Sequence, residues 1–351
     1  MSGQEREEGR EEKMSGVIDK ASSYVEGLPT WGKAAVAGGM ALAVYIPYKW
    51  YTNLPRKTPW KSDWKPGMVY LYQLPRFKSI PSLSAACLKL ETFLRMASID
   101  YEIVNAPCIQ SKEGTLPFVE LNGKEYYDSG FAIRDLTQTL NKENLEEHLS
   151  QEQKAVSRAI ECLAEKSLRN SHNVYRLENI NKLAKLIAPN AFGLFTPIIS
   201  LFFMQNYNHQ AWQSVKFSSL GVHSREDKIA IGVEDLRAIS NYLGTKHYLT
   251  GFKPTRVDAT LFGVLAQIVY APYESEHLNA IKNDFPNIME YVERIKSRYW
   301  PDWGVATSKF VTDGNWKRKP RADRGSPLNT ASPMSPASSI SPSVNGSLNK
   351  H

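Results

Sequence analysis

The sequence predicts an α/β domain followed by an all-α domain, with a membrane anchor ahead of both. Three observations support this prediction. Short apolar runs alternate with helical patterns between residues 66 and 142. The hydrophobic spacing over residues 148–310 is helical. A nearly uncharged, apolar segment occupies residues 28–51.

Length and composition set the bounds. A chain of 351 residues has room for two compact domains and tails. The net charge of +7 is uneven, with acids crowded into the first 13 residues, and no basic stripe indicates nucleic-acid binding. The three cysteines show no CxxC pair and no metal-ligand spacing, so we expect no metal site and a reducing compartment.

Residues 66–142 contain the elements of the α/β domain. MVYLYQL predicts a strand, and PSLSAACLKLETFLRMA has apolar residues at helical spacing, Cys87 among them as a core residue. YEIVNA predicts a second strand. A hairpin turning at Asn122-Gly123 follows, then a helix from about Ser129 to Leu140. This order matches a thioredoxin-like domain whose usual second helix is shortened or absent.

Helices dominate residues 148–310. AVSRAIECLAEKSLRNSHNVYRL predicts a long amphipathic helix, and Ser224 with Asp227 predicts the start of another. Thr255 with Asp258 forms a further capping box, which is structural and says nothing about substrate. Residues 186–215 carry no charged side chain, so a second membrane span is considered. Prolines and polar residues interrupt that run, which favours a pair of buried helices.

The segment 28–51 is predicted to be a single membrane anchor. Between Lys33 and Lys49 an uncharged run of 15 residues covers roughly 22 Å as a helix, against about 30 Å for a bilayer core. The two lysines can snorkel, and aromatic residues sit at both ends of the segment. The alternatives are an interfacial helix or a helix packed on the folded domain.

Basic residues follow the anchor and acids precede it, which places the folded domains in the cytoplasm. The organelle is left open, with the mitochondrial outer membrane and the endoplasmic reticulum both compatible. Residues 1–27 are predicted to be a charged disordered N-terminus and residues 318–351 a disordered Ser/Pro-rich tail. Four Ser-Pro pairs make the tail a hypothetical phosphorylation region, and a plain disordered tail is the alternative.

The stretch TLPFVELNGKEYYDSG holds the first candidate site residues. Leu116-Pro117 precedes a strand, and a cis bond there would need support from the fold. Asp128-Ser129 begins a helix, where an N-terminus binds an anion. The alternative is that Ser129 only caps the helix and Asp128 only ends the hairpin.

These patterns together resemble the glutathione S-transferase fold. PSLSAACLKLETFLRMA, FKPTRVDATLFGVLAQ and ERIKSRYWPDW more specifically resemble the failed axon connections family, close to the metaxins. The resemblance covers residues 30 to 305. It implies a thioredoxin-like domain followed by a helical domain like the C-terminal domain of glutathione S-transferases.

The resemblance also implies glutathione as the candidate ligand. The positions that correspond to the glutathione site are Ser84, Leu116, Pro117, Asp128 and Ser129. Ser84 is the candidate catalytic residue, because a hydroxyl at the start of a helix would support the ligand's thiolate. The family-typical proline after it is replaced by Ala85, and Ser84 is equally well interpreted as an N-cap.

Three functions follow from the resemblance. The first is a membrane-anchored module, non-catalytic or weakly catalytic, that acts through unidentified protein partners, for example in axon development or at an organelle surface. The second is a glutathione transferase in detoxification or stress response. The third is a metaxin-like subunit of a mitochondrial outer-membrane complex. A homodimer is left open.

Overall fold

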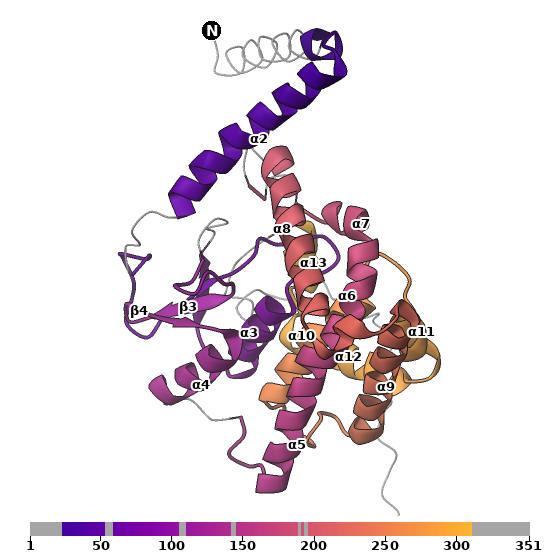
Figure 1. The fold of residues 1–351 in the computed structure, drawn as a ribbon. Coiled ribbons are helices and arrows are strands. Elements are labelled where there is room, and N and C mark those ends of the chain that lie inside the picture. Colours follow the sequence, from indigo (N-terminus) through magenta and orange to yellow (C-terminus); the bar gives the residue numbers. More distant parts are fainter. Residues whose placement is uncertain are drawn as a thin grey trace, which may run out of the picture. The chain divides into compact units, whose positions relative to one another are not determined.

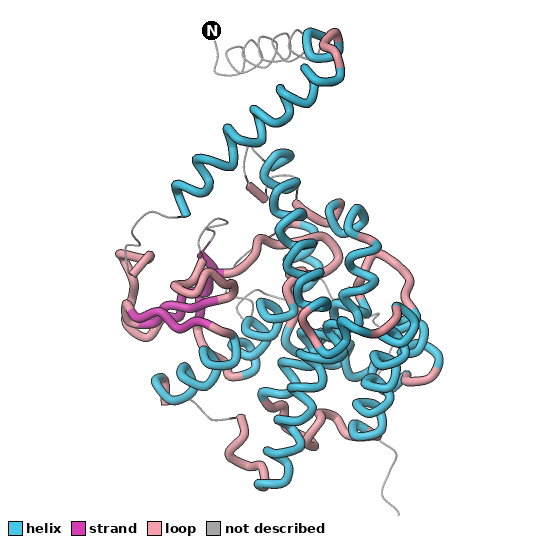
Figure 2. The backbone as a smooth tube through the Cα atoms, in the orientation of Figure 1, coloured by secondary structure: helices cyan, strands magenta, loops and turns pink. Residues whose placement is uncertain are grey.

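The structure is a computed structural model that describes residues 23–52, 59–104, 110–141, 145–188, 191–192 and 196–310. Nearly all of the predicted disordered N-terminus, the predicted tail and Cys108 lie outside the described residues. Figures 1 and 2 show helices making up most of the described chain, with the strands gathered in one small sheet.

The sheet half has the predicted order of elements. The hairpin turns at Asn122 and Gly123, whose φ angles of 52° and 78° match a primed turn. The bounds of the sheet half are β1 Val69–Tyr72, α3 Ala85–Met96, β2 Tyr101–Val104, β3 Phe118–Leu121, β4 Lys124–Tyr127 and α4 Ser129–Thr139.

The helical half runs from residue 151 to 308. The predicted long amphipathic helix is present but contains a π-helical segment, η1, between α5 and α6. The bounds are α5 Gln151–Cys162, η1 Leu163–Leu168, α6 Arg169–Glu178, α7 Ile180–Ala184, α8 Thr196–Lys216, η3 Ser219–Val222, α9 Arg225–Leu243, α10 Arg256–Val269, α11 Glu276–Asn283, α12 Pro286–Tyr299 and α13 Trp303–Ser308.

The membrane anchor predicted for residues 28–51 is corrected by the structure. A helix forms there, α2 (Thr30–Thr52), but none of the helices in the described ranges is long and apolar enough to cross a membrane. The reason lies in its composition, since Lys33, Lys49 and several Gly, Ala and Tyr residues dilute the apolar side chains. The same finding applies to the described part of residues 186–215, where a second span is considered. That run contains a single long helix, α8, with an exposed face, in place of the predicted buried pair.

The four strands form a mixed sheet in the order β2-β1-β3-β4. β1 pairs with β2 in parallel and with β3 antiparallel, and β4 completes the hairpin. One face of the sheet, with Val69, Leu71 and Val119, belongs to the main hydrophobic core. Alternate residues of the same strands necessarily point to the other face.

That second face is covered by residues 59–66, which we call the strap. Trp60 and Trp64 pack on an aromatic cluster of Tyr70, Tyr72 and Phe118. Glu120 fastens the strap: its carboxylate accepts hydrogen bonds from the backbone N–H groups of Trp60 at 2.8 Å and Lys61 at 3.2 Å. The strap is therefore part of the folded body.

The two halves meet where α3 packs on α10. Gly263 of α10 makes this close approach feasible, because a Cβ there would lie 2.6 Å from the carbonyl oxygen of Ala85. α10 is buried from Val257 to Ile268 and therefore serves both halves as core. The predicted capping box at its start is present, with Asp258 accepting from the Thr255 N–H at 2.7 Å.

A buried pair of histidines joins helices of the helical half. The Nδ1 atoms of His172 and His277 lie 3.5 Å apart, and His172 Nε2 lies 3.2 Å from the Tyr273 hydroxyl. His277 Nε2 lies 3.2 Å from the Ile229 carbonyl oxygen. Because His277 Nε2 must donate to the Ile229 carbonyl oxygen, its Nδ1 accepts from His172, and protonating His277 would place two hydrogens against each other.

This pair predicts an acid-sensitive stability. Burial lowers the pKa of His277 to about 4, below its unfolded value of about 6.5. The unfolded chain then binds protons more readily, so the stabilisation is complete above about pH 6.5 and is lost as the pH falls toward about 4. We expect a loss of about 2–3 kcal/mol from His277 over that range, measured by urea unfolding.

The comparison is made against His277→Gln, because Asp235 acts in the opposite direction. Burial raises the pKa of Asp235 to about 6, which adds stability as the pH falls. The variant retains that contribution and lacks the histidine. A wild-type curve parallel to that of His277→Gln would contradict the prediction.

Candidate functional site

The register of the sheet brings the predicted ligand positions to one edge. Tyr72 at the end of β1 lies opposite Phe118, which lies opposite Tyr127. Pro117 directly precedes this row and Asp128 directly follows it. Pro117 and Asp128, which lie at opposite ends of the hairpin sequence, therefore come to the same edge of the sheet. This is the edge at which β1 ends and the chain continues toward α3.

Leu116 and Pro117 lie just ahead of β3. The peptide bond between them is cis. Leu116 is half-buried, and it packs beside the aromatic cluster beneath the strap. Its position as a backbone edge for a peptide-like ligand stays a prediction.

Asp128, rather than Ser129, caps α4. Its Oδ1 accepts from the N–H groups of Gly130 at 2.8 Å and Phe131 at 3.2 Å. Its φ of 59° lies in the left-handed region. Ser129 is the first helical residue and is buried. The alternative in which Ser129 caps the helix is thus wrong, and the N–H groups that would bind an anion already have an internal acceptor.

A lysine that the sequence did not single out lies beside this helix start. A Cβ placed on Gly130 would lie 3.9 Å from Lys89 Nζ. Lys89 is only 4% exposed, and its Nζ forms an ion pair with Glu165 of η1 at 2.9 Å. One feature of the sequence could have indicated it: Lys89 lies within the apolar stripe of α3, where a buried charge needs a partner.

Ser84 is the N-cap of α3. Its Oγ accepts from the Cys87 N–H at 3.3 Å. Cys87 has no exposed surface, and burial raises the pKa of its thiol, which confirms the prediction that it is a core residue. The Ser84 hydroxyl is therefore already engaged in the role that its position at a helix start favours.

The loop ahead of Ser84 is held by the helical half. The carbonyl oxygen of Leu83 accepts from Arg176 Nη2 at 2.5 Å and from the Tyr207 hydroxyl at 3.2 Å. The carbonyl oxygen of Ser82 accepts from Gln267 Nε2 at 3.1 Å. Side chains from α6, α8 and α10 thus converge on the backbone next to the predicted catalytic serine, in the space between the halves.

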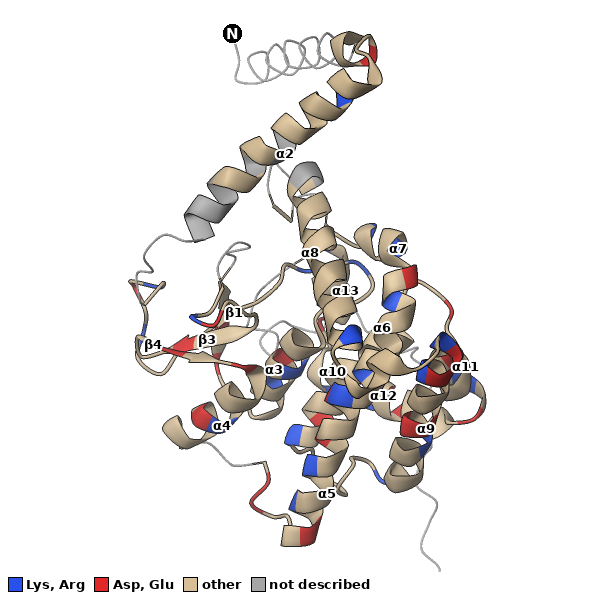
Figure 3. Cartoon of the chain, viewed as in Figure 1, with Lys and Arg blue, Asp and Glu red and all other residues tan. Residues whose placement is uncertain are grey.

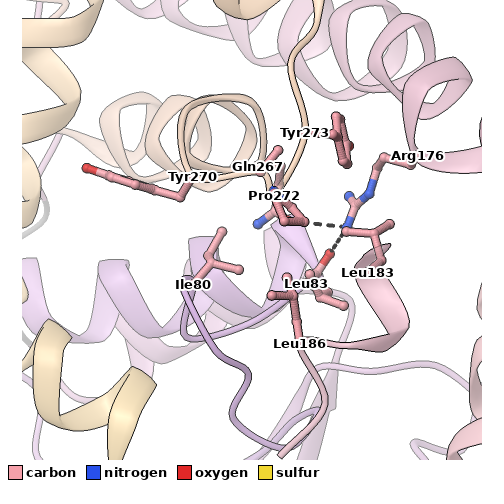
Figure 4. A pocket seen from close by; sticks show the side chains of 10 residues that line it. Ile80, Leu83, Arg176, Leu183, Leu186, Gln267, Tyr270, Pro272 and Tyr273 are labelled. Atoms are coloured by element: carbon pink, nitrogen blue, oxygen red, sulfur yellow. Dashed lines mark hydrogen bonds between the residues drawn. The ribbon is translucent and has the colours of Figure 1, made fainter. Parts of the chain in front are cut away.

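Figure 4 shows the cavity that remains in this region, with Arg176 directed toward Leu83 and Gln267. Its enclosed volume is about 10 Å³, the space of about one water molecule. Ligand pockets usually measure about 300–1,000 Å³. The walls are mostly apolar: Ile80, Leu83, Leu183, Leu186, Ala271 and Pro272.

A buried ionic cluster lies on the other side of α3. Glu91 accepts from both Arg76 Nη atoms at 2.7 and 2.8 Å and from Arg95 Nη2 at 3.1 Å. Burial alone would raise the pKa of Glu91, but the two guanidinium groups lower it to about 2. Arg95 also reaches Asp302 in the helical half at 2.6 Å. The cluster joins the halves and presents no reactive group to solvent.

Within the ranges that the structure describes, no group of three His, Cys, Asp or Glu side chains is arranged to hold a metal ion. The candidate site therefore consists of two helix caps, at Asp128 and at Ser84, and of the space between the halves that Arg176, Tyr207 and Gln267 fill.

The chain matches two family descriptions. Residues 85–182 match the glutathione S-transferase N-terminal domain and residues 232–295 match the glutathione S-transferase C-terminal domain. Together with the small mixed sheet and the helical half, these matches show a protein of glutathione S-transferase-like fold. The glutathione transferase GSTFuA3 from Phanerochaete chrysosporium, a solved structure, has a TM-score of 0.47 and 17% identity, with 67% of this chain and 97% of that chain covered.

Within that class the chain is a relative of failed axon connections and of the metaxins. It is 33% identical to Failed axon connections of Drosophila melanogaster over 71% of this chain, and spans 62% of that protein's length. It is 25% identical to Metaxin-2 of Mus musculus, over 70% of this chain and 92% of that protein.

Proposed function

We propose that this protein is a non-catalytic or weakly catalytic glutathione S-transferase-like module that acts through protein contacts at a membrane surface. The observation that supports it best is the set of hydrogen bonds from Arg176, Tyr207 and Gln267 to the loop ahead of Ser84. These side chains occupy the space through which an electrophile would approach a thiolate near Ser84. The remaining cavity of about 10 Å³ has room for about one water molecule and not for two substrates.

We expect glutathione conjugation to chlorodinitrobenzene to be at background, and Ser84→Ala to leave that rate unchanged within about twofold. The physical reason is that Arg176 and Tyr207 already occupy the space beside the loop ahead of Ser84, where they bind the Leu83 carbonyl oxygen. The assay uses the full chain, with an active glutathione transferase as positive control. A measurable rate that falls in Ser84→Ala would favour the transferase alternative.

Calorimetric titration of glutathione separates binding from catalysis. With the Asp128 carboxylate already accepting from Gly130 and Phe131, we expect no saturable binding at millimolar glutathione. Binding that is lost in Asp128→Ala and also weakened in Asp128→Asn, which retains the cap without the charge, would instead support glutathione as a ligand held at Asp128.

The second candidate is a subunit of a metaxin-like complex at the mitochondrial outer membrane. It is supported by the similarity to Metaxin-2, which extends over 92% of that protein. The test is the size of the full chain in gently solubilised membranes. Migration in an assembly larger than a homodimer supports the candidate, and migration as a monomer or homodimer contradicts it.

We place the membrane contact of residues 28–51 at the surface of the bilayer rather than across it. Trp31, Leu42 and Ile46 of α2 are exposed at 77%, 56% and 60%, and α2 contains no acid. The folded halves then lie on the cytoplasmic side, where anionic lipids attract the basic residues that follow α2. The mitochondrial outer membrane and the endoplasmic reticulum are the two compatible organelles.

A further inference from the structure

Residues 179–225 contain no Asp or Glu. They include α7, α8 and η3, and their charged residues are all basic: Lys182, Lys185, Lys216 and Arg225. Figure 3 shows the described part of α8 without any acidic residue, although acids are frequent on α9. A surface without acidic groups is unusual in a chain with 36 of them, and it lacks the charges that would repel an anionic partner.

One face of α8 is exposed along most of its length. Leu201, Gln205, His209, Trp212 and Lys216 are all exposed, and they follow one another at spacings of three or four residues. The opposite side holds Met204 and Val215, which are buried. The outward face therefore consists of apolar, aromatic and neutral polar side chains with one cation in the last turn.

Two further exposed apolar residues follow the end of α8. Phe217 and Val222 are 77% and 90% exposed. Lys216 Nζ lies 4.4 Å from the ring centre of Trp212 and 5.7 Å from that of Phe217. Together with the five residues above, we call this the α8 surface.

We propose that the α8 surface binds an anionic lipid surface. Exposed Trp, Phe and Leu beside a lysine, with no acid, suit the headgroup region of a bilayer, where aromatic rings are enriched and lysines can snorkel. Lysine can extend its ammonium to lipid phosphates while its stem and the aromatic rings stay in apolar contact. The inference rests on the membrane-surface part of the proposed function and adds a contact that does not depend on α2.

The test is co-sedimentation of the full chain with vesicles, either phosphatidylcholine alone or phosphatidylcholine and phosphatidylserine in equal parts. We expect binding to the anionic vesicles that weakens as salt is raised. Trp212→Glu and Phe217→Glu should each lower the affinity by about tenfold or more, because each adds an acid to the contact. Both side chains are exposed, so the variants are expected to fold.

The matched control is Phe252→Glu. Phe252 is 86% exposed and has a lysine beside it in the sequence, but it lies between α9 and α10, outside the acid-free segment. The affinity of the Phe252→Glu variant for anionic vesicles should equal that of the wild type. A further variant, Ile46→Glu in α2, tests the membrane contact proposed for α2.

Each other outcome overturns the proposal in a distinguishable way. Wild-type affinity in the Trp212 and Phe217 variants, with loss only in Ile46→Glu, removes the α8 surface and leaves the α2 contact standing. Equal binding to neutral vesicles removes the anionic specificity. No binding to either vesicle removes both membrane contacts. Unchanged vesicle binding with loss of a larger assembly would make the α8 surface a protein interface. The conjugation assay is independent of all four.

Discussion

Replacing Glu91 by alanine is expected to lower the free energy of unfolding by about 3–5 kcal/mol. The carboxylate is 0% exposed and is shared by Arg76 and Arg95, which are 3% and 1% exposed. Without it, two guanidinium groups stay buried with no carboxylate between them, and only Arg95 retains Asp302. The measurement is the midpoint of urea unfolding at neutral pH.

The matched control is Glu178→Ala, which removes the partner of Arg225 in a surface pair at 2.5 Å. Both of its side chains are about two-fifths exposed, so the expected loss is about 0–1 kcal/mol. Similar losses in the two variants would mean that the buried cluster is not held by charge compensation. Glu91→Gln, which preserves shape and removes the charge, should fall between them.

Asp258→Ala is expected to cost about 3–5 kcal/mol, since each buried polar group left without a partner costs about 1–3 kcal/mol. Its Oδ1 accepts from the Leu249 N–H and the Tyr291 hydroxyl, both at 2.8 Å. Its Oδ2 accepts from the N–H and hydroxyl of Thr255. The substitution therefore removes the cap of α10. It also leaves the hydrogen-bond donors of Leu249, Thr255 and Tyr291 without an acceptor.

Asp227 provides the control, because it occupies the same third position of α9 but is exposed. Its backbone N–H, which the substitution preserves, donates to the Ser224 cap at 3.1 Å. Asp227→Ala should cost about 0.5 kcal/mol or less by urea unfolding. Equal effects at the two positions would contradict the prediction, because they would show that the buried hydrogen bonds of Asp258 add nothing to the effect of an acid at the start of a helix.

Local patterns predicted the local structure well. The Asn122-Gly123 hairpin and the caps at Ser224 and Thr255 depend on neighbouring residues, and all three are present. The spacing around Cys87 predicted α3 and its buried face. Such features can be read from a short window, because their partners lie within a few residues.

The features that join the halves could not be predicted in this way. Arg95 and Asp302 are 207 residues apart in the sequence, and Gln267 lies 185 residues from Ser82. Lys89 and Glu91 are charged residues in a buried helix stripe, so they need partners, but the sequence does not say where these partners lie. The single capping residue of α4 was missed because Asp and Ser are both good caps, and only the backbone angles distinguish them.

The strap has a consequence for release from a membrane. Trp60 and Lys61 are bound to Glu120, whereas α2 ends at Thr52. Proteolytic cleavage between Thr52 and Pro59 would separate α2 from the body and leave the strap bound on the sheet. Cleavage after Lys65 would instead remove Trp60 and Trp64, uncover Tyr70, Tyr72 and Phe118, and favour self-association of the fragment. The first cut sheds an intact protein, and the second produces an aggregation-prone one.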